Sequence, residues 1–302
     1  MSKSVDNAHD DAIWTACWTS KRRVLTASVD ATLKLWDPTT LSSSEEGDGP
    51  VLTLTGHDLG VIDAAVAPDG VRAVSTGFDS VRVWDLDSGA CTGSMASGSV
   101  EAWAVAIDPF AGTNFAVSSH AGGVGIYAVD SMEPVSSLEG AGKKFGLCLE
   151  YSPDGTKLAM GGNDGSVTLF DLASGSVSTT FTSHAKPVRA LAFSPNNDIL
   201  LSASDDMHVN MYDLMGGIFV SSTTAHSSWV LGLTYSPDAG NYATSSSDKQ
   251  VKVWELNSRE PVHTFAGHSD QVWSVAYDDT GSRLVSAGDD ARIQIYDCPQ
   301  TL

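Results

Sequence analysis

Basic residues are scarce in this chain. Its 302 residues include 17 Lys and Arg against 37 Asp and Glu, a net charge of −20 at neutral pH. Proteins that bind nucleic acid draw most of their non-specific affinity from clustered Lys and Arg, and the only basic clusters here are residues 21–23 and 143–144. We therefore expect no direct nucleic-acid binding, and the acidic balance favours a basic protein partner.

Cysteines and long apolar runs are also sparse. Four cysteines lie far apart with no CxxC pair: Cys17, Cys91, Cys148 and Cys298. This spacing argues against a zinc site or a disulfide framework and favours buried thiols in a reducing compartment. No run approaches the ~20 apolar residues that span a bilayer, and the first residues lack the apolar core of a signal peptide. We expect an intracellular protein without a membrane segment.

Motifs of catalysis are missing as well. There is no G-x-S-x-G nucleophile elbow and no HExxH pair. Residues 140–144, GAGKK, resemble part of a phosphate-binding loop, but Ser137 stands where the first Gly belongs and Lys144 replaces the Ser or Thr. Three isolated histidines are expected at exposed positions: His120, His208 and His263. We expect no enzyme, no metal and no cofactor.

What the chain does contain is a repeat. Six aromatic–acid pairs and one related pair recur along it: Trp36-Asp37, Trp84-Asp85, Tyr127-Ala128, Phe170-Asp171, Tyr212-Asp213, Trp254-Glu255 and Tyr296-Asp297. Successive aromatics are 48, 43, 43, 42, 42 and 42 residues apart. In most units an Asp lies five or six residues before the aromatic, and in five units a His lies 21 or 22 residues before that Asp. A period of about 40–45 residues with these marks is typical of a β-propeller blade.

Seven marks predict an all-β, seven-bladed propeller that forms one domain over residues 1–302. Turn sequences such as SPDG at 152–155 separate four short strands in each unit. Only six residues follow Tyr296, so the last blade lacks an outer strand. We expect the N-terminal stretch around Lys3 to supply it and to close the ring, which removes an open edge. Residues 39–50 lengthen the first interval and predict a surface loop.

The repeated His and Asp predict a structural network. A buried His can bond a Ser or Thr hydroxyl that accepts the Trp indole N–H, while the turn Asp holds the His; an orphan in such a site costs roughly 1–3 kcal/mol. Two units carry predicted tetrads: His9, Ser28, Asp30 and Trp36, and His226, Ser246, Asp248 and Trp254. The third and fourth units have Gly98 and Gly142 in place of the His, and Ala121 replaces the third unit's Asp.

A propeller without catalysis displays a binding surface. Counted from the His position, the fourth residue of each unit is small or aliphatic and predicts packing between blades: Ile13, Val61, Ala102, Gly146, Val188, Val230 and Val272. Period-two alternation turns neighbouring positions toward the upper mouth of the central channel. Candidate partner-binding residues there are Trp14, Phe78, Trp103, Phe145, Arg189, Trp229 and Trp273, with Asp11 and Asp270. Apolar patches mark interaction sites; the alternative is that some rings merely plug the channel.

These marks resemble the WD-repeat family and, within it, the small WD-repeat subunit of the superkiller complex. The matching stretches include AHDDAIWTACW (8–18), GHDLGV (56–61), AHSSWVLGL (225–233), DQVWSVAY (270–277) and IQIYDCP (293–299). The resemblance implies a scaffold that is monomeric within a larger complex. It implies a tetratricopeptide-repeat partner subunit and, through it, an RNA helicase that feeds mRNA to the exosome for 3′-to-5′ decay.

The resemblance also implies a second role in the RNA polymerase II-associated factor complex, in transcription elongation and histone modification, and so a place in both cytoplasm and nucleus. It implies that the upper face recognises a partner arginine and a following aliphatic residue, with Asp11 or Asp270 pairing the arginine. Two other classes stay open. A substrate receptor of a cullin-type ubiquitin ligase would carry W-D-x-R marks, and no Arg occurs at that position here. A histone-tail reader would need an acidic central mouth.

Overall fold

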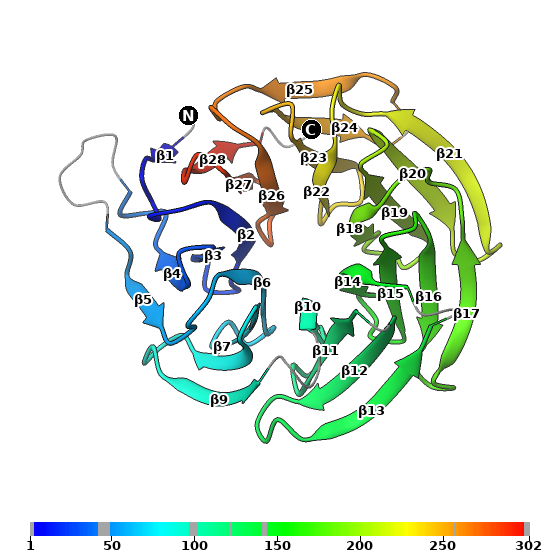
Figure 1. Cartoon of the computed structure of the whole chain (residues 1–302). Helices are drawn as coiled ribbons and strands as arrows, with labels where there is room; N and C mark the ends of the chain where they lie inside the picture. Colours follow the sequence, from blue (N-terminus) through cyan, green and yellow to red (C-terminus); the bar gives the residue numbers. More distant parts are fainter. Residues whose placement is uncertain are drawn as a thin grey trace.

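Seven antiparallel sheets of four strands each stand around a central axis (Figure 1). The structure is a computed structural model and describes residues 3–41, 49–96, 102–120, 122–140, 144–256 and 258–298. The prediction of an all-β, seven-bladed propeller is confirmed. None of the described residues forms a helix long and apolar enough to cross a membrane.

Each blade begins with an inner strand at the axis and ends with an outer strand at the rim. Blade 1 contains β2 (Ile13–Trp18), β3 (Val24–Ser28), β4 (Thr32–Trp36) and β5 (Leu52–Thr55). Blade 2 contains β6 (Val61–Val66), β7 (Arg72–Gly77), β8 (Ser80–Asp85) and β9 (Cys91–Ala96). Blade 3 contains β10 (Ala102–Ile107), β11 (Asn114–Ser119), β12 (Gly123–Ala128) and β13 (Pro134–Glu139). Blade 4 contains β14 (Gly146–Tyr151), β15 (Lys157–Gly162), β16 (Val167–Asp171) and β17 (Ser176–Phe181).

The remaining three blades repeat the pattern. Blade 5 contains β18 (Val188–Phe193), β19 (Ile199–Ser204), β20 (His208–Asp213) and β21 (Ile218–Thr224). Blade 6 contains β22 (Val230–Tyr235), β23 (Asn241–Ser246), β24 (Val251–Glu255) and β25 (Pro261–Phe265). Blade 7 contains β26 (Val272–Tyr277), β27 (Arg283–Gly288), β28 (Ile293–Asp297) and, from the start of the chain, β1 (Lys3–Val5).

The ring is closed by β1, as the sequence predicts. This strand pairs antiparallel with β28, with Lys3 opposite Ile295 and Val5 opposite Ile293. Lys3 also donates a 2.7 Å hydrogen bond from Nζ to the carbonyl of Pro38 in blade 1. The N-terminal segment therefore joins the first and last blades, and Figure 1 shows β1 beside β28.

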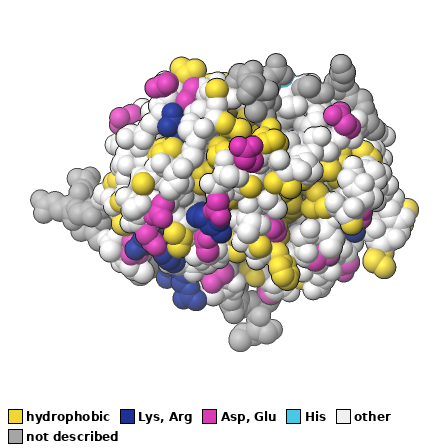
Figure 2. Space-filling model, turned by 90° about the horizontal axis from the view of Figure 1, so that it is seen from below, with side chains coloured by type: hydrophobic (Ala, Val, Ile, Leu, Met, Phe, Trp, Pro, Cys, Tyr) yellow, Lys and Arg dark blue, Asp and Glu magenta, His cyan; other side chains and the backbone are white. Residues whose placement is uncertain are grey.

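Apolar packing between neighbouring blades stabilises the disc. The seven fourth-position residues, from Ile13 to Val272, are all buried. One hydrophobic cluster combines Leu25 and Leu33 of blade 1 with Ala73 and Trp84 of blade 2. Each such cluster removes side chains of two blades from water together, at roughly 25 cal/mol per Å² of apolar surface. Seen from its rim, the disc carries scattered acidic side chains, with apolar ones reaching the surface among them (Figure 2).

Some predicted features lie outside the described residues. They include residues 42–48 of the surface loop expected at 39–50. They also include Gly98, Ala121 and Gly142 of the irregular third and fourth units.

Candidate functional site

The first predicted tetrad forms, but with a different hydroxyl. His9 Nδ1 lies 2.8 Å from Asp30, and His9 Nε2 lies 2.8 Å from Thr26 Oγ1. The indole N–H of Trp36 donates to the same Thr26 oxygen at 2.9 Å. The prediction of Ser28 as the bridge was wrong. Ser28 lies at the end of β3, where its hydroxyl accepts the N–H of Asp30, and Thr26 lies two residues deeper on the same face of the strand.

The second predicted tetrad needs the same correction. Thr244, and not Ser246, bridges His226 Nε2 at 2.7 Å and the Trp254 indole at 2.9 Å. Ser246 accepts the N–H of Asp248. Three further blades build the same network: His57, Ser75, Asp79 and Trp84; His184, Ser202, Asp206 and Tyr212; and His268, Ser286, Asp290 and Tyr296.

These networks look like catalytic Asp-His-Ser triads but lack access to a substrate. Thr26 and Thr244 are completely buried, and each hydroxyl already bonds an aromatic group. Burial lowers the pKa of His226, which favours the neutral ring. Burial opposes ionisation of Asp248, but the hydrogen bond and charge of His226 outweigh it and lower its pKa to about 2. Among the described residues, no three His, Cys, Asp or Glu side chains gather as a metal site requires.

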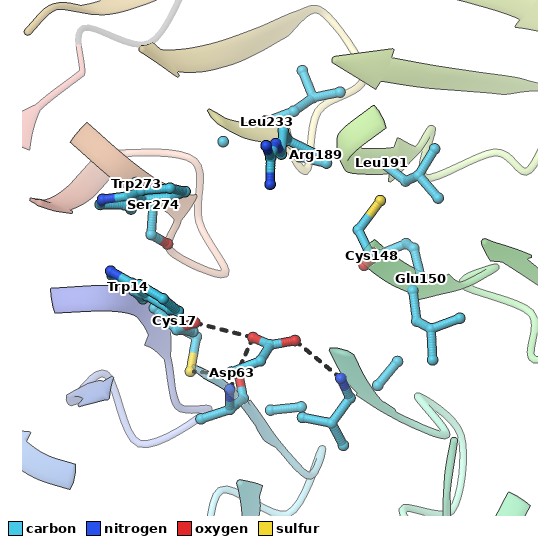
Figure 3. A pocket seen from close by; sticks show the side chains of 18 of the residues that line it. Trp14, Cys17, Asp63, Cys148, Glu150, Arg189, Leu191, Leu233, Trp273 and Ser274 are labelled. Atoms are coloured by element: carbon cyan, nitrogen blue, oxygen red, sulfur yellow. Dashed lines mark hydrogen bonds between the residues drawn. The ribbon is translucent and has the colours of Figure 1, made fainter. Parts of the chain in front are cut away.

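The inner strands surround a central cavity of about 630 Å³. All seven fifth-position residues line it: Trp14, Ile62, Trp103, Leu147, Arg189, Leu231 and Trp273. Figure 3 shows side chains from several inner strands converging on this space. Each inner strand has a register irregularity just after its fourth residue, as between Ile13 and Thr15, so the fifth residue lies in a β-bulge. The fourth residue is buried between blades, and the bulged fifth residue lines the cavity.

Six rings form an aromatic cluster at the upper mouth of the cavity: Trp14, Phe78, Trp103, His120, Phe145 and Trp273. Trp14 lies with its ring centroid 5.4 Å from Trp273, 6.4 Å from Phe78 and 6.5 Å from Trp103, and Trp103 has the most ring neighbours, four in all. Trp103 meets Phe145 edge-on at 5.1 Å. The three tryptophans are half-buried and Phe78 is 49% exposed. The rings therefore support one another and still present apolar surface.

His120 belongs to this cluster, although the sequence suggested an isolated histidine. Its ring stacks on Phe145 with centroids 3.8 Å apart and faces the edge of Trp103 at 6.4 Å. A signal was present: His120 precedes the position of the missing turn Asp, just as Phe78 precedes Asp79 in blade 2. That register position brings both residues to the mouth.

Trp229 does not join the aromatic cluster. It is 44% exposed in the turn before β22, and its carbonyl accepts the N–H of Ser247. No ring contact connects it to the other tryptophans in the part of the chain that the structure describes. Of the four tryptophans predicted to bind a partner at the mouth, three therefore lie in the aromatic cluster.

Carboxylates lie next to the aromatic cluster. The indole N–H of Trp273 donates to Asp289 at 2.6 Å, and Gln271 donates to the same carboxylate at 3.0 Å. Burial raises the pKa of Asp289, and the negative charges of Asp270 and Asp11 raise it further. We call Asp11, Asp270 and Asp289 the acidic sector. None of the three has a Lys, Arg or His partner within ion-pair distance among the described residues.

Arg189, a predicted partner contact, is engaged inside the molecule. Its guanidinium donates three hydrogen bonds to Asp205, from Nε to Oδ1 at 3.0 Å and to Oδ2 at 3.2 Å, and from Nη2 to Oδ2 at 2.8 Å. Asp205 is 5% exposed. A forked pair of this kind neutralises a nearly buried carboxylate, and the Arg189 side chain, 24% exposed, still lines the cavity.

Deeper in the cavity lie two carboxyl groups that the sequence did not reveal. Asp63 accepts hydrogen bonds from the Thr15 hydroxyl and from the N–H groups of Ala64 and Val105, and so links three blades (Figure 3). Burial raises its pKa to about 6. Burial, followed by the charge of Asp63, raises the pKa of Glu150 to about 8. Burial in the cavity therefore opposes the ionisation of both carboxyl groups.

The ring of blades, the buried tetrads and the displayed mouth define a WD-type propeller, a class of protein-interaction scaffolds. The family described as "WD domain, G-beta repeat" matches residues 2–37 and 48–85, and "Nucleolar protein 10-like, N-terminal domain" matches residues 143–300. The chain belongs to the WD-repeat family of β-propellers.

The chain is also similar to individual known proteins, two of which are named for their WD repeats. WD repeat-containing protein VIP3 of Arabidopsis thaliana is 37% identical over 63% of this chain and 62% of its own length. WD repeat-containing protein SL1-17 of Schistosoma mansoni is 34% identical over 61% of each chain. Meiotic recombination protein rec14 of Schizosaccharomyces pombe is 30% identical over 64% of this chain and 62% of its own. The chain spans less than two thirds of the length of each of these relatives.

Proposed function

We propose that this chain is a scaffold without catalysis of its own, which binds a short partner segment at the upper mouth of the propeller. The observation that carries the proposal is the aromatic cluster lying directly beside the acidic sector. A guanidinium pairs with carboxylates and stacks on aromatic faces. A partner arginine would meet Asp289, Asp270 or Asp11, and a following aliphatic residue would pack on Trp14 and Trp273.

The partner in this proposal is a tetratricopeptide-repeat subunit that also holds an RNA helicase, as in the superkiller complex. The chain would then assist 3′-to-5′ mRNA decay by the exosome in the cytoplasm. A second assembly would be the RNA polymerase II-associated factor complex in the nucleus. Support comes from the resemblance of the AHDDAIW and IYDCP stretches and from the similarity to VIP3.

Calorimetric titration of the tetratricopeptide-repeat subunit tests the proposal. Trp273→Ala should weaken binding by at least about tenfold, because a central aromatic anchor usually contributes roughly 2 kcal/mol or more. The matched control is Arg22→Ala in the turn after β2, where the side chain is 65% exposed and only loosely paired with Asp279. Equal affinities for the wild type and both variants would place the partner elsewhere on the disc.

The acidic sector also favours a second candidate, a reader of basic histone tails. Both candidates use the same carboxylates, but a histone-tail reader needs no tetratricopeptide-repeat partner. Titration of the same protein with a histone H3 tail peptide separates them. Tight binding of the tail, with no measurable binding of the tetratricopeptide-repeat subunit, would favour the reader.

A further inference from the structure

Exposed apolar side chains concentrate at one place on the rim. Eleven large hydrophobic residues are exposed in the described part of the chain, and four of them lie within six consecutive positions of blade 5. They are Met215 at 88%, Ile218 at 56%, Phe219 at 46% and Val220 at 51% exposure. Large apolar side chains gathered on a surface mark interaction sites more often than scattered ones do.

Three of the four, Ile218, Phe219 and Val220, lie on β21, which has a free edge. It is the last strand of its sheet and pairs only with β20. With seven residues it is the longest outer strand of the ring. Sheet edges are often protected by charges or proline: β13 and β25 begin with Pro134 and Pro261, and β1 begins with Lys3. The outer strands β5, β9 and β17 contain neither, but none of them carries an exposed large apolar side chain. No Asp, Glu, Lys or Arg occurs between Asp213 and Asp238, so β21 lacks such protection.

The register of β21 shows where another strand could pair. Phe219 lies opposite Tyr212 and Ser221 opposite Met211, so Val220 forms a bulge. Beyond the bulge, Ser221–Thr224 continue in regular register with β20. An added strand would therefore take its backbone hydrogen bonds from Ser221–Thr224 and place aliphatic side chains beside Ile218 and Val220.

The negative charge of this protein limits which kind of strand could pair with β21. A second copy of this chain would bring another net charge of −20 to the contact, which opposes self-association. Asp213, at the end of β20, places a carboxylate at the start of the turn that leads into β21. We propose that β21 is a docking site for an extended, aliphatic segment of a partner protein with basic residues at its ends, which adds to blade 5 as a fifth strand.

The probe is a short, dye-labelled peptide of alternating Val and Thr with Lys at both ends, followed by fluorescence anisotropy on the full chain. The double variant Ile218→Thr with Val220→Thr should bind it about tenfold more weakly, because two aliphatic contacts are lost and strand propensity is kept. Val135→Thr is the matched control, since Val135 is 57% exposed on the proline-started strand β13. Val135→Thr should bind the peptide as tightly as the wild type does. Trp273→Ala should do so too, because the peptide is expected on β21 and not at the upper mouth.

Two further measurements make the test specific. Adding the peptide should slow amide hydrogen exchange at Ser221–Thr224 and leave the outer strand β17 unchanged. A peptide with Glu in place of both Lys should bind at least about tenfold more weakly, since its charges would be repelled. Equal binding of both peptides, equal weakening by Val135→Thr, or no change in exchange on β21 would overturn the proposal. So would sedimentation that shows the wild type, and not the double variant, to be a dimer.

Discussion

The indole N–H of Trp273 donates a 2.6 Å hydrogen bond to the carboxylate of Asp289. This contact joins the aromatic cluster to the acidic sector, and it orients the ring that packs most closely on Trp14. A change in the charge of Asp289 should therefore affect both the position of the Trp273 ring and the charge of the acidic sector.

Asp289→Asn should separate folding from binding. Asparagine keeps an acceptor for Trp273 but removes a charge that Asp270 and Asp11 repel. Because the folded pKa of Asp289 is raised, wild-type stability falls as pH rises from the carboxyl's ordinary value through the raised one. The variant should thus unfold at higher urea than the wild type at pH 7 and at equal urea near pH 3. Its affinity for an arginine-containing partner should fall; a loss of stability at pH 7 would contradict this reading.

Thr26→Val should destabilise the protein more than Ser28→Ala. Valine keeps the shape of threonine but leaves His9 Nε2 and the Trp36 indole without a partner in a fully buried site. We expect a loss of about 2–3 kcal/mol for Thr26→Val and about 1 kcal/mol for Ser28→Ala, whose bonds go to turn backbone. Urea unfolding of both variants measures the difference. Equal losses of unfolding free energy would contradict the role of Thr26 as the hydroxyl that bridges His9 and Trp36.

The sequence predicted the fold well because the constraint repeats. Seven marks at a constant period specify seven blades, and strand alternation predicts that Trp14 and Trp273 face the axis. It could not choose between Thr26 and Ser28, since residues two apart share one face of a strand. The place of His120 at the mouth could not be predicted, because Ala121 replaces the turn Asp that marks this position in other units. Phe145 and Trp229 precede their inner strands, so alternation does not govern them, and only Phe145 reaches the cluster.

The buried histidines should make stability depend on pH. Burial lowers the folded pKa of His57, His184 and His226 below the usual 6.5. The unfolded chain therefore takes up more protons, and stability should fall as pH drops below about 6.5. A second loss should come between about pH 4 and 2, where Asp248 is protonated against its lowered folded pKa. Unfolding free energies measured from pH 8 to pH 4 check the first window, and acid titration by circular dichroism checks the second.

Asp248→Ala should remove one of these contributions without touching the mouth. The change leaves His226 Nδ1 and the N–H of Ser227 without their acceptor. We expect a loss of roughly 1–3 kcal/mol in unfolding free energy and unchanged affinity for an upper-mouth partner. An unchanged melting temperature together with weakened partner binding would show that this His–Asp pair is functional and not structural.

Arg189→Ala should act through stability and only secondarily through binding. It leaves Asp205, which is 5% exposed, as a buried carboxylate without its cation. Removing one member of a buried ion pair usually costs more than replacing both. We expect a loss of about 2–3 kcal/mol for Arg189→Ala, and most of it should return in the double variant Arg189→Met with Asp205→Leu, which fills the space with apolar side chains. Urea unfolding of the wild type, single and double variants forms the test. A single variant of wild-type stability that has lost partner affinity would show instead that the guanidinium leaves Asp205 to meet the partner.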